Sequence, residues 1–209
     1  MVKSKRISFL ASLTQGYTTA LDIGCDHGYV LKEALDYGYI KYAIASDLRE
    51  MPLQNAIETL RNYPIKAILS DGFLAINEPF DVAIIAGMGA HLIKDIMKHA
   101  PLGDMTYIIQ PNDRHSYLRK HLMEMGFMIV DEHAIYDRFF YLVMIVKRGN
   151  MVLSEEDLIL GPILKHKKEA KPYYEHVLKR LDNIMIQADE KRVKELSHSY
   201  AIITNHLKR

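Results

Sequence analysis

The chain has 209 residues, 27 of them Lys or Arg and 26 Asp or Glu, so its formal net charge is +1 and favours neither a strongly basic nor a strongly acidic function class. No apolar stretch reaches transmembrane length and the start lacks a signal-peptide pattern, while the single cysteine excludes an internal disulfide framework. The ten histidines form no HxH or HExxH arrangement, so we expect no metal. Together with the preceding features, this predicts a compact cytoplasmic protein that does not bind a membrane.

The first informative segment is a glycine-containing loop after an apolar run. Residues 21–29 read LDIGCDHGY, in which Asp22 and Gly24 close a strand-like run and Gly28 leads into a helix-like segment at 30–38. Glycine lets the backbone approach a ligand closely, and a helix N-terminus presents free N–H groups. This pattern predicts a nucleotide-type site.

Two further strand-like runs also end in acids. Residues 42–47 (YAIASD) end in Asp47, about twenty residues beyond the loop, where nucleoside-binding domains place a carboxylate on the ribose hydroxyls. Residues 65–69 lead into Ser70, Asp71 and Gly72, for which an ordinary turn is the alternative interpretation. Acids at three successive strand ends together favour a nucleoside site.

The rest of the first 149 residues continues the alternation of strands and helices. We expect helices at 51–62, 91–99 and 114–125, and strands at 80–86 and 105–110. Residues 127–133 and 139–147 resemble a terminal antiparallel pair, with Phe139, Phe140 and Tyr141 in its core. This order predicts an α/β protein with a doubly wound, Rossmann-like sheet of seven strands.

The acidity of the loop indicates which nucleoside binds. The dinucleotide fingerprint is G-x-G-x-x-G, whereas this loop has the carboxylate of Asp26 between Gly24 and Gly28. A pyrophosphate is repelled by a carboxylate. S-adenosylmethionine carries a sulfonium, an ammonium and no phosphate, so it fits this loop better.

A resemblance to a known family rests on five motifs in order. LDIGCDHGY, AIASD, SDGF, IIAGMGA and IIQPND resemble the bacterial tRNA (adenine(22)-N(1))-methyltransferase family, TrmK, from about Lys5 through residue 147 and more loosely beyond. The resemblance implies a class I methyltransferase fold with a helical, coiled-coil-like extension. It also implies S-adenosylmethionine as the cofactor and N1 of an adenine in the tRNA D-arm as the target.

Carried onto this chain, the resemblance assigns the cofactor-binding residues. The cofactor's amino-acid end falls to Asp22, Gly24, His27 and Gly28, its ribose to Asp47 and Leu48, and its adenine to Asp71 and Gly72. Ala86 is also assigned to the cofactor, and the methyl group is expected beside Gly87, Met88 and Gly89. The substrate is expected beside Tyr29, Gln110 and Pro111.

The chemistry of the reaction suggests three catalytic candidates. N1 of adenine has a free lone pair and needs alignment rather than a strong base, but the methylated base is cationic. An oxygen near its amino group would therefore stabilise the transition state. We expect Asp26 or Asn112 in this role, with His27 third; the alternatives are a helix N-cap for Asp26 and a turn for Asn112.

The last 60 residues differ from the rest in charge and in apolar spacing. We expect residues 1–149 to form the methyltransferase domain and residues 150–209 a helical tRNA-binding extension.

The charge of this C-terminal region favours RNA binding. From residue 147 onward the chain has thirteen basic and nine acidic residues, and a basic cluster contains Lys165, Lys167, Lys168 and Lys171. A solvated helix face is the alternative for this cluster. Apolar residues then recur at spacings of three and four, interrupted at 187–191, which favours two antiparallel helices in a monomer over one long helix or a dimer.

Two other function classes are compatible with these residues. One is a methyltransferase acting on another RNA or on a small molecule, although the basic extension argues against the small molecule. The other is a non-catalytic RNA-binding protein that retains a cofactor pocket, against which the intact acids at positions 22, 47 and 71 argue.

Overall fold

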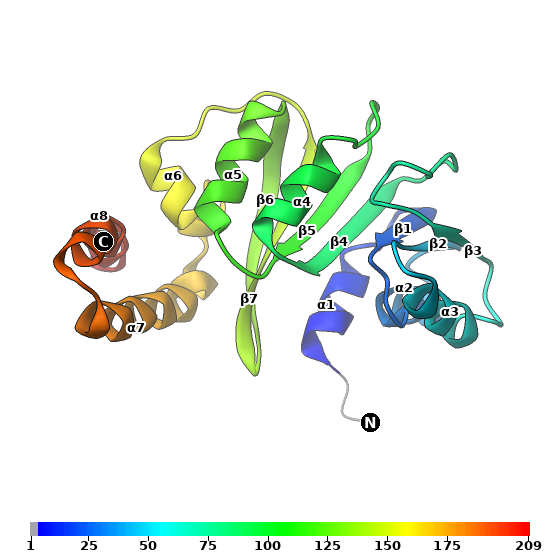
Figure 1. The fold of residues 1–209 in the computed structure, drawn as a ribbon, viewed down its shortest axis with the longest axis horizontal. Helices are drawn as coiled ribbons and strands as arrows, with labels where there is room; N and C mark the ends of the chain where they lie inside the picture. The colour runs from blue at the N-terminus through cyan, green and yellow to red at the C-terminus, as the bar shows by residue number, and fades with distance from the viewer. Residues whose placement is uncertain (1–3) are drawn as a thin grey trace.

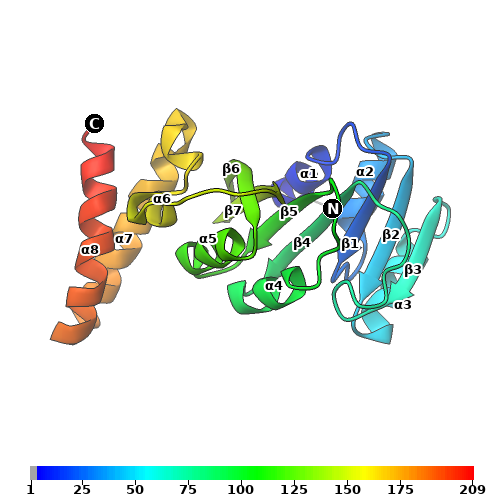
Figure 2. The ribbon, with the colours of Figure 1, turned by 90° about the horizontal axis from the view of Figure 1, so that it is seen from above.

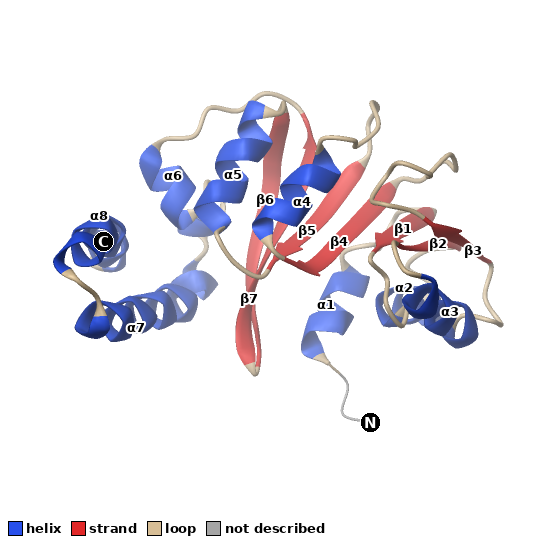
Figure 3. Ribbon diagram, in the orientation of Figure 1, coloured by secondary structure: helices blue, strands red, loops and turns tan. Residues whose placement is uncertain are grey.

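The protein is described by a computed structural model that covers residues 4–209; residues 1–3 of the predicted first domain lie outside it. Within the described residues seven strands form one sheet in the order β3-β2-β1-β4-β5-β7-β6 (Figures 1 and 3). The strands are β1 (Thr19–Ile23), β2 (Tyr42–Asp47), β3 (Ile65–Leu69), β4 (Val82–Met88), β5 (Thr106–Pro111), β6 (Phe127–Asp137) and β7 (Phe139–Arg148). Strands β1 to β5 are parallel, and β7 is antiparallel to both of its neighbours. The predicted seven-stranded Rossmann-like sheet is confirmed.

Helices cover both faces of this sheet, as the view from above shows (Figure 2). One layer contains α1 (Lys5–Ser12), α2 (Tyr29–Asp36) and α3 (Glu50–Thr59), and the other contains α4 (Ala90–Met97) and α5 (His115–Glu124). Successive strand residues point to opposite layers, so Ala20 packs in the first core and Leu21 in the second. Burial on both faces explains why β4 is apolar over most of its length.

The order of the strands places a crevice between β1 and β4. From β1 the chain crosses to β2 on one side, whereas β4 pairs with β1 on the other. Ligands of open α/β sheets bind beyond the carboxyl ends of the strands at such a switch point. The glycine loop follows β1, and residues 86–88 end β4 at the same carboxyl edge of the sheet.

The β6–β7 hairpin projects beyond the sheet, which corrects one sequence prediction. Strand β6 continues past the predicted end at residue 133 because it pairs with β7 as far as Asp137. The prediction that Phe139 belongs to the strand core is wrong, since 66% of its surface is exposed near the turn. Phe140 and Tyr141 are partly buried.

The C-terminal extension is an antiparallel pair of helices on a short connecting region. Helix α6 (Glu155–Leu160) is followed by the 3-10 turns η1 (Leu164–His166) and η2 (Lys168–Ala170), then by α7 (Lys171–Gln187) and α8 (Glu190–Leu207). The ring of Tyr174 near the start of α7 lies 5.0 Å from that of His206 near the end of α8, which confirms the antiparallel arrangement. No helix within residues 4–209 is long and apolar enough to cross a membrane.

A buried ion pair joins the extension to the sheet. Arg119 of α5 and Glu132 of β6 are 1% and 0% exposed and lie 2.9 Å apart. Glu132 also accepts hydrogen bonds from the backbone N–H groups of Ile163 and Leu164, while Arg119 donates to the carbonyl of Leu158. The core of the α4–α5 layer continues through Tyr173 and other extension residues, so the two regions pack as one body. A functional boundary at residues 149/150 stays a prediction.

Candidate active site

The glycine loop is built against the end of β4. Gly24 has φ +74, and its N–H donates a 2.8 Å hydrogen bond to the carbonyl of Ser46. A Cβ at this position would lie 2.2 Å from the methyl carbon of Met88. Gly24 therefore lets the loop pack closely on Met88 at the end of β4, and its predicted role in the approach of a ligand stays a prediction.

Helix α2 begins at this loop without a side-chain cap. Its N-cap is Gly28, with φ +69 and no side-chain hydrogen bond to the first turn. The alternative role of Asp26 as the N-cap is therefore wrong. The first N–H groups of a helix need a partner, and here they remain for a ligand. A Cβ on Gly28 would meet Leu60 at 2.9 Å, so this glycine serves close packing.

Two carboxylates occupy the ends of β1 and β2. Asp22 is 5% exposed, and burial raises the pKa of its carboxyl to about 7; the positive charge of Arg6 opposes the rise and Asp47 adds to it. Asp47 is 6% exposed and accepts hydrogen bonds from the N–H groups of Arg49 at 3.0 Å and Asp26 at 3.4 Å. Both acids are thus buried, and two backbone hydrogen bonds fix the carboxylate of Asp47.

A cavity of about 290 Å³ lies between these elements. It brings together seven predicted site residues: Asp22, Gly24, Asp26, His27, Tyr29, Ala86 and Gly87. The Cys25 thiol also lines it, and burial raises the pKa of that thiol, so it is not an activated nucleophile.

Three exposed or half-exposed side chains surround the cavity on the loop side. The side chains of His27 and Asp26 are 45% and 65% exposed, with Nε2 of the first 3.8 Å from Oδ2 of the second. The rings of His27 and Tyr29 stack with their centroids 5.3 Å apart. These groups face solvent and are accessible to a large substrate.

Sequence reasoning missed Arg6, which enters the cavity from α1. Its Nε donates a 2.6 Å hydrogen bond to Oε1 of Gln110, and its guanidinium lies 5.3 Å from the centre of the Tyr141 ring. A Cβ on Gly87 would lie 3.0 Å from Arg6. The positive φ of +81 and this close approach explain the glycine at position 87.

A relay of amides connects Arg6 to Asn112. Gln110 is fully buried and donates from Nε2 to Oδ1 of Asn112 at 3.2 Å. Nδ2 of Asn112 donates to the carbonyl of Gly87 at 2.8 Å, and its backbone N–H donates to that of Met88. Because Gln110 and Pro111 are buried, they have almost no surface for the predicted substrate contact, and Gln110 instead orients the exposed Asn112.

The predicted ribose and adenine residues lie outside the lining of the cavity. Leu48 is 63% exposed beyond β2, and Asp71 is exposed after β3. Gly72 has φ +55, and a Cβ on it would lie 3.2 Å from Ile96, so the backbone conformation and the tight contact with α4 both favour glycine here. The assignment of Asp47, Leu48 and Asp71 to the nucleoside stays a prediction.

The four lysines predicted to bind tRNA divide into two pairs. Lys165 and Lys167 form ion pairs with Asp157 at 2.7 Å and Asp131 at 2.5 Å, so both are tied to neighbouring elements. Lys168 is exposed and has no ion-pair partner among residues 4–209, and Lys171 is exposed with Glu175 at 4.0 Å.

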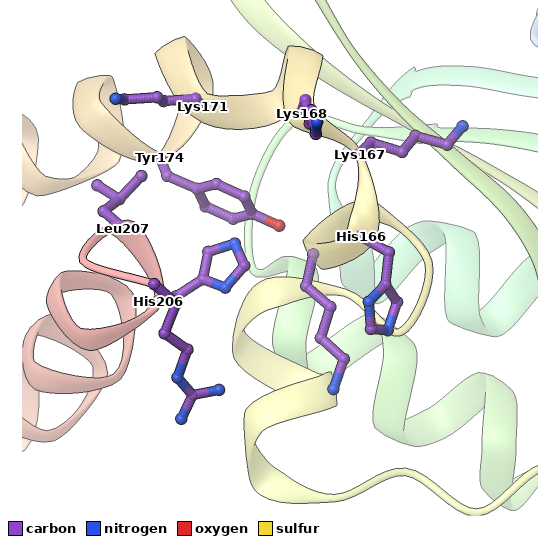
Figure 4. A pocket seen from close by; sticks show the side chains of 9 residues that line it. His166, Lys167, Lys168, Lys171, Tyr174, His206 and Leu207 are labelled. Carbon is purple, nitrogen blue, oxygen red and sulfur yellow. The ribbon is translucent and has the colours of Figure 1, made fainter.

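All four lysines line a second cavity of about 380 Å³ at the base of α7 and the end of α8. Figure 4 shows the rings of Tyr174 and His206 next to each other inside it, in an edge-to-face arrangement. Arg209 and His166 complete its basic lining. Because Lys165, Lys167 and Arg209 form ion pairs with neighbouring acids, the positive charge available to a phosphate group is concentrated on the exposed Lys168 and Lys171.

The sheet order, the acidic strand ends and the uncapped helix at the switch point together define a class I, S-adenosylmethionine-type methyltransferase. No group of three or more His, Cys, Asp or Glu within residues 4–209 could hold a metal ion.

Comparison with known proteins identifies the family. The sequence profile of TrmK, tRNA (adenine(22)-N(1))-methyltransferase, matches residues 20–207, and the chain belongs to this family. A Mycoplasma pneumoniae protein described as a candidate tRNA methyltransferase is 33% identical over 84% of this chain and 88% of its own length.

Two solved structures extend the similarity to the whole fold. A Streptococcus pneumoniae protein described as a candidate tRNA (m1A22) methyltransferase, in complex with S-adenosyl-L-methionine, is 30% identical with a TM-score of 0.84, over 98% of this chain and 99% of its own. TrmK of M. capricolum, in complex with S-adenosyl-homocysteine, is 25% identical with a TM-score of 0.83. The similarity covers 100% of this chain and 99% of that chain.

Proposed function

We propose that this chain holds S-adenosylmethionine in the switch-point cavity and directs methyl transfer to N1 of adenine 22 in the D-arm of tRNA. The observation that carries the proposal is the pairing, in one cavity, of the buried acid Asp22 with the uncapped N-terminus of α2. The zwitterionic amino-acid end of the cofactor offers an ammonium and a carboxylate to these two features.

The residues that would hold the cofactor follow from charge. Asp22 would face the ammonium, whereas Arg6 and the first N–H groups of α2 would face the carboxylate. Asp47 would accept from the ribose hydroxyls, with Asp71 and Gly72 on the adenine side. When bound, the cofactor supplies an electrophilic methyl group on a sulfonium.

Asn112 is the best placed of the catalytic candidates. Its amide is fixed by Gln110 and by the carbonyl of Gly87, so its oxygen has a set orientation and one lone pair left to accept from the exocyclic amino group of adenine. A prealigned acceptor stabilises the positive charge that develops on the base. Asp26 would add a negative charge from the loop, with His27 beside it.

The remaining assignments concern the RNA. N1 lies on the Watson–Crick edge, so the target adenine must leave its stack before reaction, and the exposed ring of Tyr29 would contact it. Lys168 and Lys171 would contact phosphates, while Lys167 joins the extension to β6 through Asp131 and Lys165 pairs with Asp157 within the extension. We further infer a monomer that acts in the cytoplasm, where tRNA is modified.

A binding and turnover comparison tests these roles. Purified wild type, Asn112→Ala and Asp26→Ala are incubated with methyl-labelled cofactor and an unmodified tRNA transcript, and cofactor affinity is measured separately. We expect methyl transfer to fall about tenfold or more in Asn112→Ala with little change in cofactor affinity. An unchanged rate would remove Asn112 from the reaction, and wild type active only on other RNAs would favour the alternative substrate class.

A further inference from the structure

The β6–β7 hairpin overhangs the edge of the sheet where the candidate active site lies. Ile109 of β5 pairs with Met144 of β7, and β5 ends two residues later. The hairpin continues to Phe139, three residues beyond that end, which amounts to roughly 10 Å at the usual strand rise. Figures 1 and 2 show it between α1 and α7.

Two aromatic side chains are exposed on this projection. Phe139 is 66% and Tyr136 58% exposed. They lie on opposite faces of the hairpin, because residues paired across the two strands share a face. Phe139 pairs with Asp137, which contacts Ser4 at the start of α1. Tyr136 pairs with Phe140, which packs on Tyr173 of α7. The centroid of the Phe140 ring lies 5.9 Å from that of Tyr173 and 5.2 Å from that of His176. Phe139 therefore faces the active-site side, whereas Tyr136 faces the extension.

The hairpin tip is also bound to the site through α1. Oδ2 of Asp137 accepts from the hydroxyl of Ser4 at 2.7 Å and from the N–H of Arg6 at 3.1 Å. The side chain of Arg6 then reaches Gln110, and through it Asn112. The tip is thus a fixed wall beside the reacting centre.

Methylation at N1 requires an unstacked adenine, and an aromatic surface beside the site would stabilise the opened RNA. An extruded adenine loses its stacking, and its neighbours in the RNA are left with an open face. Aromatic side chains replace lost stacking without regard to sequence. The turn residue Arg138 adds a positive charge next to Phe139, which suits the phosphates on either side of an exposed base.

We propose that the β6–β7 hairpin is a second tRNA contact, in which Phe139 stacks on a base next to the target adenine and Tyr136 continues the contact toward the extension. This inference rests on the proposed function, because it names the tRNA as the occupant of the exposed tip.

The absence of tryptophan from the sequence offers a direct probe. Phe139→Trp places a single indole at the tip, and its fluorescence is followed as unmodified tRNA is added. The matched control is Tyr42→Trp, at the opposite edge of the sheet, where Tyr42 is 55% exposed. We expect quenching in Phe139→Trp and none in Tyr42→Trp.

Turnover gives the second readout. Phe139→Ala is expected to lower kcat/KM for tRNA about tenfold, in keeping with the loss of one stacked base, while affinity for S-adenosylhomocysteine stays unchanged. Tyr42→Ala should behave as wild type. Arg138 has φ +63, a backbone conformation that glycine adopts easily. Arg138→Gly should therefore weaken tRNA binding without loss of stability.

The outcomes separate the two claims. Wild-type enzyme that methylates tRNA, together with an unquenched indole and an unaltered Phe139→Ala, would overturn the hairpin contact. Quenching of the indole by tRNA without wild-type methyl transfer would count against the proposed reaction and support the contact.

Discussion

Replacing Asp22 by Asn tests the electrostatic basis of cofactor binding. Burial raises the pKa of Asp22 to about 7, with Arg6 of α1 opposing the rise and Asp47 of β2 adding to it. An ammonium bound beside Asp22 favours the ionised form, so binding must release protons wherever the free carboxyl is protonated. Affinity should therefore rise with pH up to about 7 and level off above it.

The size of the effect follows from the ionised fraction of the free protein. With a pKa of about 7, roughly 9% of the Asp22 carboxyl is ionised at pH 6 and roughly 90% at pH 8. If only the ionised form binds, affinity for S-adenosylhomocysteine should increase about tenfold between these values. About half a proton should be released per ligand bound at pH 7.

Isothermal titration calorimetry in buffers with different ionisation heats measures both quantities. Asp22→Asn should bind more weakly at pH 8 and lose most of the pH dependence. His27 also lines the cavity, so His27→Asn serves as the matched control at a neighbouring position and should keep the pH dependence of the wild type. Wild-type affinity that is flat from pH 6 to pH 8, with no proton release, would refute the reasoning.

Three further predictions concern packing and the RNA contact. Gly24→Ala should destabilise the fold by about 1 kcal/mol or more and weaken cofactor binding, because φ is positive and the new Cβ meets Met88; urea unfolding checks it. Arg119→Met should cost about 3 kcal/mol by leaving Glu132 buried without its partner, and adding Glu132→Gln should recover part of that loss in the same assay. Lys168→Glu should weaken tRNA binding and lower its salt dependence, measured by filter binding at several salt concentrations, and leave cofactor affinity unchanged.

Local patterns in the sequence were sufficient to predict seven strands and to select residues that the fold brings to the candidate site. Asp22, Gly24 and Asp47 could be found because each follows an apolar run, and a parallel sheet brings the carboxyl ends of such runs to one edge. Gly87 and Asn112 were predicted from the family resemblance, because the spacing of apolar residues in the sequence does not distinguish them.

Residues whose roles depend on distant contacts escaped the sequence. Arg6 donates to Gln110, 104 positions away, and reaches it only because α1 lies on the sheet beside the hairpin. Helix α1 was itself not predicted, although Ser4 precedes it as an N-cap. The exposure of Phe139 was missed because an apolar strand end has the same pattern whether it is buried or extends past the sheet.

The most direct test of the account maps the product of the reaction. An unmodified tRNA transcript is treated with methyl-labelled S-adenosylmethionine and the purified protein, digested with nuclease and analysed by mass spectrometry. The account predicts N1-methyladenosine at adenine 22, lost when that adenine is replaced. Measurable cofactor binding without methyl transfer to adenine 22 would contradict it.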